Sequence, residues 1–248
     1  MKVMAIIPAR YDSVRFPGKP LIDLAGKPMI QHVYERACQV SLFQRVIVAT
    51  DDVRIRDAVR AFGGDAVMTS PHHQTGTDRL AEVAQTLDVD LVVNVQGDEP
   101  LIQPAMIEQA VQPLLADEQV AIGTLKQRIV QPADLFNPHI VKVVVDRQDR
   151  ALYFSRSPLP FVKGVDMRGA GFHTSRFYRH IGLYAYRRDF LLRFTTLPQT
   201  PLEIAEGLEQ LRALEYGDII KVIETEYESI GVDTPADVAP VVALMRQT

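Results

Sequence analysis

The amino-acid sequence predicts an α/β fold, with a mostly parallel sheet flanked by helices and a strand-rich insertion in the second half. The first 125 residues alternate between short apolar runs rich in Val and Ile and amphipathic helical stretches. Strands that are apolar on both faces are typical of a parallel sheet covered by helices. From about residue 126 to 186 the strands follow one another with few helices between them, which is typical of antiparallel pairing.

In the first half, each apolar run is followed by a stretch with helical periodicity. The stretch opened by Pro28 has apolar residues at a spacing of 3.6, and residues 51–62 combine an acidic first turn with a stop at Gly63-Gly64. In such a sheet, ligands bind at the carboxyl ends of the strands. The expected strands are 2–7, 45–50, 65–69, 91–95 and 120–125, and the expected helices begin at Pro28, Asp51, Thr77 and Pro104.

The second half contains the predicted insertion and then returns to helical periodicity. Residues 164–176, which include three glycines, are expected to form a mobile loop. No linker divides the chain, so we expect one domain over residues 1–248 with an insertion at about 126–186. The expected elements are strands at 141–146, 151–155 and 181–187, a helix over 201–215, a strand near 219–225 and a last helix from Pro235.

Composition excludes several classes of protein. A hydrophobic content of 47% over 248 residues is ordinary for a globular protein with a substantial core. A net charge of −4 without a basic run argues against nucleic-acid binding. No stretch approaches the roughly 18 apolar residues of a membrane span, and Pro8 and Arg10 interrupt the apolar start too early for a signal peptide. We therefore expect a cytoplasmic protein without a membrane partner.

The single cysteine, Cys38, excludes an intrachain disulfide. Cys38 sits among the apolar positions of the first expected helix. We therefore expect its thiol to pack in the interior rather than to react.

The loop after the first strand carries three cations. The apolar run ends at Pro8, and Arg10, Arg15 and Lys19 follow around Gly18. The loop is neither a P-loop nor a G-x-G-x-x-G motif. One interpretation is a solvated surface loop. The other is a polyanion site, because three cations suit a triphosphate with about four negative charges and loop amides add hydrogen-bond donors.

Two carboxylates are candidates for a magnesium site. Asp98 follows the fourth strand directly, at the carboxyl end where a carboxylate can hold Mg²⁺ against phosphate oxygens. Asp233 follows a short apolar stretch and could complete the site. The alternatives are a Gly-Asp turn at Asp98 and an ordinary helix start at Thr234-Pro235.

The segment "SPHHQTGTDR", residues 70–79, concentrates hydroxyl groups, a glycine and an arginine between a strand and a helix. We expect Thr77 to be the helix N-cap. The pair His72-His73 does not favour zinc, because adjacent side chains point apart and no third ligand follows.

The insertion places cations beside aromatic residues on strands. Arg156 follows "ALYFS", and Arg179 and His180 open "RHIGLYAY". Such cations suit a small carboxylate substrate, and the alternative is exposed surface charge.

Eight motifs are spread in order over nearly the whole chain: "IIPARYDSVRFPGKPL", "VATDD", "MTSPHHQTGTDRLAE", "VNVQGDEPLI", "ALYFSRSPLP", "HIGLYAYR", "LEQLRALEYG" and "GVDTPAD". Together they resemble the 3-deoxy-manno-octulosonate cytidylyltransferase (CMP-Kdo synthetase) family. The first motif also occurs in other sugar-activating nucleotidyltransferases, whereas "NVQGDEP", "ALYFSR" and "GVDTP" are more specific. The stretch 163–177 departs most from the family pattern, so no role is assigned to it.

The resemblance implies a nucleotidyltransferase (Rossmann-like) fold and a cytoplasmic homodimer formed through the insertion. It also implies a reaction in which CTP and the sugar acid Kdo (3-deoxy-D-manno-octulosonate) give CMP-Kdo and pyrophosphate for lipopolysaccharide biosynthesis. Mg²⁺ is the implied cofactor, held by Asp98 and Asp233. Transfers of this kind depend on positioning and charge stabilisation more than on covalent catalysis.

The same resemblance implies roles for individual residues. Arg10, Lys19, Asp98 and Asp233 are the implied catalytic residues. The residues implied to bind nucleotide are Pro8 and Ala9 through their backbone, Arg10, Arg15 and Lys19 at the triphosphate, and Ser70, Gly76, Thr77 and Arg79 at the base and ribose. The residues implied to face the sugar acid are Gln96, Arg156, His180, Glu206, Glu209 and Gln210, with Arg156 the candidate for the carboxylate.

Two rival interpretations remain open at this stage. The enzyme could activate a related acid, such as sialic acid or an 8-amino form of Kdo. The chain could instead be a nucleotide-binding regulator that keeps the fold and has lost the chemistry. Both carboxylates and all three loop cations are present, which argues against the regulator.

Overall fold

The computed structural model describes residues 1–12, 16–169, 172 and 177–246. The chain forms two compact units, each built from segments that are distant in sequence. Unit 1 comprises Met1–Glu108, Ala185–Thr195 and Tyr227–Thr248, and unit 2 comprises Gln109–Tyr184 and Thr196–Glu226. Unit 2 thus contains most of the predicted insertion, and it also takes in 109–125 and 196–226.

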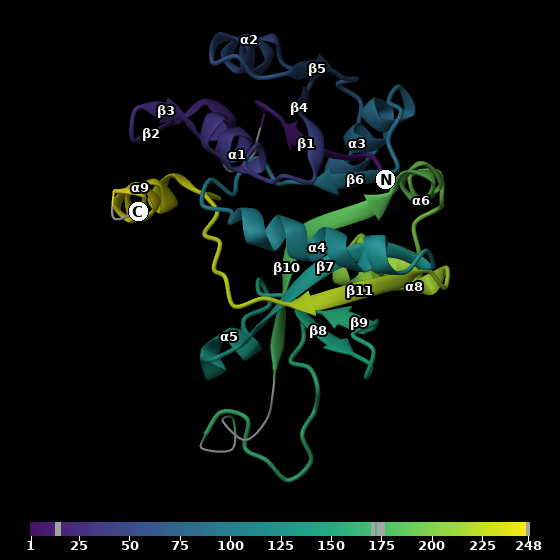
Figure 1. Ribbon diagram of the computed structural model, residues 1–248. Coiled ribbons are helices and arrows are strands. Elements are labelled where there is room, and N and C mark those ends of the chain that lie inside the picture. The colour runs from purple at the N-terminus through teal and green to yellow at the C-terminus, as the bar shows by residue number, and fades with distance from the viewer. Residues whose placement is uncertain (13–15, 170–171, 173–176, 247–248) are drawn as a thin grey trace. The chain divides into compact units, whose positions relative to one another are not determined.

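Unit 1 is organised around parallel strands. Its parallel strands include β1 (Val3–Ala9), β4 (Phe43–Thr50), β5 (Ala66–Met68) and β6 (Leu91–Asn94). Strand β1 pairs in parallel with both β4 and β6, and β4 pairs in parallel with β5 (Figure 1). All four residues of β6 are buried, as continuous apolar strands require.

Helices cover these strands and bury the apolar positions that recur along them. Helices α1, α2 and α3 pack against β1 and β4 or their neighbours, and α6 packs on α3 (Figure 1). The helices with residues in unit 1 are α1 (Met29–Ala37), α2 (Val53–Ala61), α3 (Gly76–Gln85), the start of α4 (Pro104–Ala116), α6 (Arg188–Phe194) and α9 (Val238–Met245), with 3-10 turns at Lys19–Leu21 and Pro235–Asp237.

Unit 2 combines parallel and antiparallel pairing. Strand β7 (Val120–Arg128) pairs in parallel with β11 (Ile219–Glu224). Strand β8 (Lys142–Val145) pairs antiparallel with both β9 (Ala151–Ser155) and the first part of β10 (Tyr178–Arg187), of which residues 178–184 belong to this unit. This confirms the antiparallel prediction (Figure 1). The helices of this unit are the end of α4, α5 (Pro132–Phe136), α7 (Pro201–Glu206) and α8 (Gln210–Glu215). The predicted fold class, α/β with mostly parallel strands, is therefore confirmed.

The single helix predicted over 201–215 is wrong, because the chain there forms α7 and α8. Gly207 ends α7 in a left-handed conformation with φ of 61°, and the Leu208 N–H donates to the Glu203 carbonyl. Glu203 of α7 forms a buried ion pair with Arg212 of α8. Apolar periodicity continues through the break, so it hides the glycine stop.

Smaller corrections concern helix ends. The acid predicted for the first turn of α2 is its N-cap, since the Asp52 carboxylate accepts the Arg54 N–H. The N-cap of α3 is Thr75 rather than Thr77, because a capping box joins Thr75 and Asp78. Cys38 does not pack in the interior: it caps the C-terminus of α1 and is exposed.

The sequence patterns did not predict the two-stranded hairpin β2 (Asp23–Leu24) and β3 (Lys27–Pro28), or the short helices α5 and α6. These elements have two to seven residues, which is too short for a period to be recognised. The loop predicted over 164–176 lies partly outside the described residues. Among those described, Phe172 stacks on Phe177 in a small apolar cluster.

The packing of α4 on β7 predicts the effect of one substitution. A Cβ added to Gly123 of β7 would lie 2.0 Å from the Ala110 carbonyl oxygen of α4, so helix and strand would have to separate. We expect Gly123→Ala to lower the free energy of unfolding by about 2 kcal/mol, measured by urea denaturation. The matched control is Gly182→Ala on β10, where the added Cβ meets nothing within 4 Å. Equal stability of the two variants would contradict this packing.

Candidate active site

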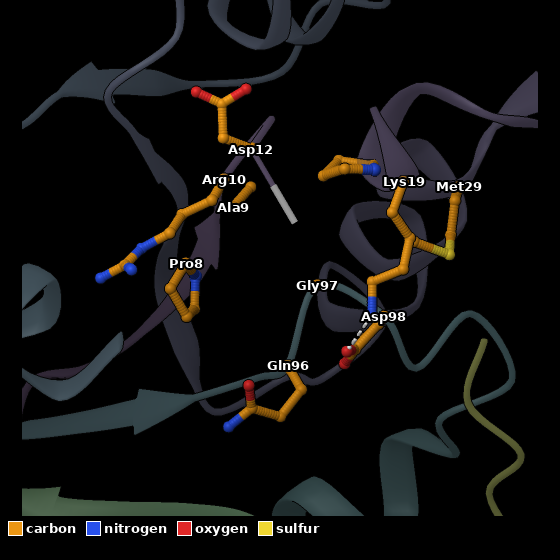
Figure 2. Close-up of a pocket in the computed structure, with 10 residues that line it drawn as sticks. Pro8, Ala9, Arg10, Asp12, Lys19, Met29, Gln96, Gly97 and Asp98 are labelled. Carbon is orange, nitrogen blue, oxygen red and sulfur yellow. Dashed lines mark hydrogen bonds and ion pairs between the residues drawn. The ribbon is translucent and has the colours of Figure 1, made fainter. Parts of the chain in front are cut away.

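A pocket of about 300 Å³ lies in unit 1, at the carboxyl ends of β1 and β6 (Figure 2). Parallel strands that end at the same edge bring the segments following them together, which is where such sheets bind ligands. Gly97 makes the close approach possible, because a Cβ there would lie 2.9 Å from the Pro8 carbonyl oxygen. The residues that line the pocket are Pro8, Ala9, Arg10, Asp12, Lys19, Pro20, Met29, Gln96, Gly97 and Asp98.

The centre of the site is the ammonium group of Lys19. Its Nζ lies 2.6 Å from Oδ2 of Asp98 and 3.6 Å from Oδ1 of Asp233 (the Asp98 contact is drawn in Figure 2). The Lys19 side chain is 12% exposed, whereas those of Asp98 and Asp233 are 36% and 57% exposed. Three segments that are far apart in sequence therefore bring one cation and both predicted metal ligands together.

Local bonds fix each of these three residues. The opening loop is closed by a 2.8 Å bond from the Gly18 N–H to the Tyr11 carbonyl, and Gly18 adopts φ of 72° just before Lys19. The Val232 N–H donates to the Asp98 carbonyl at 2.9 Å, which ties the segment carrying Asp233 to the segment carrying Asp98. The positions of the two carboxylates are thus coupled through backbone.

Arg10 points away from Lys19 and Asp98 (Figure 2). Its Nη2 donates to the carbonyl oxygen of His73, at the start of the segment before α3. That segment is held by Glu82 of α3, whose carboxylate accepts the Ser70 N–H at 2.9 Å and contacts the His73 ring. Burial alone would raise the pKa of Glu82, but these partners hold it below its usual range. Arg15, the third cation of the opening loop, lies outside the described residues.

The segment 70–79 lies against the first strand. A Cβ on Gly76 would meet the Pro8 ring at 3.4 Å, so the segment and β1 are in contact. Thr77 is buried in the first turn of α3. Arg79 is fully buried, and its guanidinium bonds to the Thr69 hydroxyl and to Asp51. In this geometry Arg79 holds the segment 70–79 in place.

The donor set around Lys19 fits Mg²⁺. Two carboxylate oxygens within 4 Å of one cationic atom are hard ligands of the type this ion takes, and it usually completes its shell with phosphate and water. Among the described residues, no third His, Cys, Asp or Glu joins them in a metal-holding group.

In unit 2, Arg156 is held by backbone carbonyls. Its Nε donates to the Glu206 carbonyl at 2.7 Å, Nη1 to the Pro138 carbonyl at 3.1 Å and Nη2 to the Gly207 carbonyl at 3.4 Å. A guanidinium has five N–H groups, so these bonds fix its plane without using all of its donors. Arg179, by contrast, donates through Nε and Nη2 to the side-chain oxygen of Gln127.

His180 differs from the prediction in its charge. Its ring packs against Phe154 and Tyr184, and Nε2 lies 2.9 Å from the Thr124 hydroxyl. Burial lowers the pKa of His180 from 6.5 to about 3. The predicted cation is therefore a neutral imidazole near pH 7, able to hydrogen-bond but not to form an ion pair with a carboxylate.

The three predicted sugar contacts near α7 and α8 do not lie on one helix. Glu206 is the last residue of α7, and its carboxylate accepts the Ser155 hydroxyl and the Arg156 N–H. Glu209 is the N-cap residue of α8, and the buried Gln210 is its first residue. Glu206 is thus engaged with the strand end that carries Arg156.

Two residues that shape these sites were not predicted. Glu82 belongs to the helix start "TDRLAE", where a solvated charge is the ordinary interpretation. Lys142 is a fully buried lysine that begins the otherwise apolar strand β8. A single lysine followed by three valines was a signal that could have singled out this position.

None of the described helices is long and apolar enough to cross a bilayer.

The chain is similar in sequence to known cytidylyltransferases. A family model described as cytidylyltransferase matches residues 4–225. The 3-deoxy-manno-octulosonate cytidylyltransferase of Geobacter metallireducens is 60% identical, covering 98% of this chain and 97% of its own length. The enzyme of the same name from Trichlorobacter lovleyi is 57% identical over the full length of both chains.

Solved structures give the same relationship. A CMP:2-keto-3-deoxy-manno-octonic acid synthetase complexed with CTP superposes with a TM-score of 0.94 at 47% identity, covering 100% of this chain and 99% of its own. The 4-diphosphocytidyl-2C-methyl-D-erythritol synthase of Anaerococcus prevotii has a TM-score of 0.62 at 14% identity, covering 99% of this chain and 98% of its own, which indicates a shared fold.

The neutral His180 predicts a pH dependence of stability. In the unfolded chain the imidazole binds a proton as the pH falls through 6.5, whereas the folded chain binds it only near pH 3. The unfolded state therefore gains the proton first, and folding loses about 2 kcal/mol between pH 6.5 and 4.5. We expect His180→Gln to remove this loss, measured by urea denaturation at both pH values. The control is His139→Gln, at an exposed position of the same unit, which should keep the wild-type dependence.

Proposed function

Because the chain belongs to the cytidylyltransferase family, and within it to the 3-deoxy-manno-octulosonate cytidylyltransferases, we propose that it transfers CMP from CTP to Kdo. The chain is thus a nucleotidyltransferase. The oxygen of the sugar's anomeric hydroxyl bonds to the α-phosphorus, the bond to the β-phosphate oxygen breaks, the hydroxyl proton is released and pyrophosphate leaves. The observation that carries this proposal is the convergence of Lys19, Asp98 and Asp233 at the strand ends of unit 1.

The cations of the opening loop are proposed to hold the triphosphate. Lys19 offers a compact charge, and Arg10 and Arg15 offer planar forks that can each bind two phosphate oxygens. They stabilise charge that develops on the leaving pyrophosphate, which is the largest contribution a protein makes to such a transfer.

Asp98 and Asp233 are the residues proposed to hold Mg²⁺. When bound, the ion neutralises phosphate charge and helps to orient the triphosphate for in-line attack. The Lys19 ammonium now lies between the same two carboxylates, so they neutralise it until phosphate oxygens can replace them. This exchange leaves Lys19 free to contact the nucleotide.

The sugar acid is proposed to bind through residues of unit 2. Arg156 supplies the charge for the carboxylate, and the neutral His180 supplies a hydrogen bond to the sugar. Selection of cytosine is assigned to backbone groups of Pro8 and Ala9 and to the segment 70–79, whose Gly76 lies against Pro8. A homodimer and a cytoplasmic location remain predictions.

The proposal is tested by pyrophosphate release with each of the four nucleoside triphosphates and with Kdo, 8-amino-Kdo and sialic acid. We expect turnover with CTP and Kdo, and a catalytic efficiency with ATP at least about 100-fold lower, since the wrong base leaves buried donors unpaired. A preference for another acid would support the rival substrate. The absence of turnover with every pair would identify a nucleotide-binding regulator instead.

The proposed metal site predicts a further result. Asp98→Asn keeps the shape of the side chain but removes a charged ligand, so we expect turnover at limiting Mg²⁺ to fall about 1000-fold. The control is Asp189→Asn on α6, whose side chain is 96% exposed and should leave turnover unchanged. Near-normal activity of Asp98→Asn at limiting Mg²⁺, or activity of the wild type in excess chelator, would contradict the assignment.

A further inference from the structure

Lys142 is a buried cation without an acidic partner among its described hydrogen bonds. Its side chain is fully buried, and its Nζ donates to the carbonyl oxygens of Asn137 at 2.9 Å, Ile140 at 2.6 Å and Arg156 at 2.6 Å. An ammonium has three N–H donors, so the three carbonyls use all of them. Burying a charge is costly even when it is hydrogen-bonded, and this cost calls for a physical reason.

The reason lies in the place where the three bonds meet. Two of them hold the turn 137–140, and the third holds the backbone of Arg156. The same turn supplies the Pro138 carbonyl that accepts Nη1 of Arg156. Lys142 therefore fixes both the backbone of Arg156 and one of the acceptors that orient its guanidinium.

Glu206 holds Arg156 from the other side. Its carboxylate accepts the Arg156 N–H at 2.9 Å and the hydroxyl of Ser155, the residue before it. Its carbonyl oxygen accepts Nε of Arg156 at 2.7 Å. The peptide N–H of Arg156 is thus bound by Glu206, its C=O is bound by Lys142, and its side chain is bound by the segments that these two residues fix.

We propose that Lys142 and Glu206 are positioning residues, which fix the guanidinium of Arg156 in the orientation that receives the carboxylate of the sugar acid. This inference rests on the proposed function, in which Arg156 binds that carboxylate. A fork-to-carboxylate bond depends on the direction of the donors as well as on charge, so a guanidinium that can rotate binds less well. Glu206 then acts through Arg156 rather than on the sugar hydroxyls.

The alternative is that Lys142 only stabilises the β8–β9 region. A buried lysine of the same unit makes the two roles separable. Lys126 of β7 is 3% exposed, pairs with Asp149 and lies over the Tyr178 ring, and in the described part of the chain its side chain makes no hydrogen bond or ion pair with Arg156. Replacing either lysine by methionine removes a buried charge, so both variants should lower the melting temperature.

Kinetics in the sugar acid and calorimetric titration of CTP distinguish the roles. We expect Lys142→Met to raise the KM for Kdo at least about tenfold at saturating CTP, while the Kd for CTP changes less than about twofold. Lys126→Met should change neither constant. An unchanged KM in a folded Lys142→Met protein, or an equal rise in Lys126→Met, would overturn the proposal.

A double-mutant cycle then asks whether Lys142 acts through Arg156. Arg156→Lys alone should raise the KM for Kdo at least about tenfold, because a lysine cannot form the fork. Adding Lys142→Met to Arg156→Lys should raise it less than about threefold further. If the full tenfold effect of Lys142→Met persists without the guanidinium, Lys142 does not act by positioning Arg156.

Two provisions keep the test decisive. If Lys142→Met does not fold, Glu206→Gln takes its place in the same cycle, since an amide cannot accept both the Ser155 and the Arg156 hydrogen bonds as the carboxylate does. If the wild type prefers another sugar acid, the cycle is run with that acid, so the substrate assignment can fail while the positioning role stands. A wild type that turns over no acid overturns both.

Discussion

The site in unit 1 depends on one constraint, the parallel alignment of β1 with its neighbours. Ala9 of β1 is in register with Thr50 of β4, so these two strands end together, and β6 ends on the same side at Asn94, which is in register with Ile6. The loop that carries Lys19 and the loop that carries Asp98 both leave from that edge. Because neither strand end can shift without breaking the buried ladder, the backbone on both sides of the pocket is fixed before any ligand binds.

The fold could be predicted from the sequence where buried periodicity is long. The strands of unit 1 and helices α1 to α4 follow from apolar spacing and from the prolines and glycines at their ends. The break at Gly207 was missed because Leu208 and Leu211 continue the apolar pattern across it, and only the left-handed backbone of Gly207 shows the stop. Cys38 was placed inside for the same reason: its neighbour Ala37 is buried, but the thiol lies one residue beyond the helix.

The residues of the candidate sites also divide into those that the sequence predicts and those that it does not. Asp98 and Lys19 could be predicted, because residues that directly follow strands or lie in loops beside them keep their place when the sheet forms. The charge state of His180 could not, because it depends on Phe154 and Tyr184, which only the folded strands bring against the ring. The sequence predicts that Glu206 binds sugar. In the structure its carboxylate instead accepts hydrogen bonds from Ser155 and Arg156, about 50 residues away, and a short motif cannot show such a contact.

Lys19 and Lys142 have different roles because they differ in burial and in the type of partner that they bind. Lys19 pairs with carboxylates that are themselves partly exposed, as the proposed transfer of these carboxylates to Mg²⁺ and of Lys19 to phosphate oxygens would require. Lys142 is fully buried, and its partners are backbone carbonyls that are part of the fold and cannot leave. Exchange of partners at Lys142 would leave neutral acceptors without donors in a low-dielectric interior, which is expensive. The partners of the first lysine can therefore be exchanged, as the proposed function requires, whereas those of the second hold a fixed geometry.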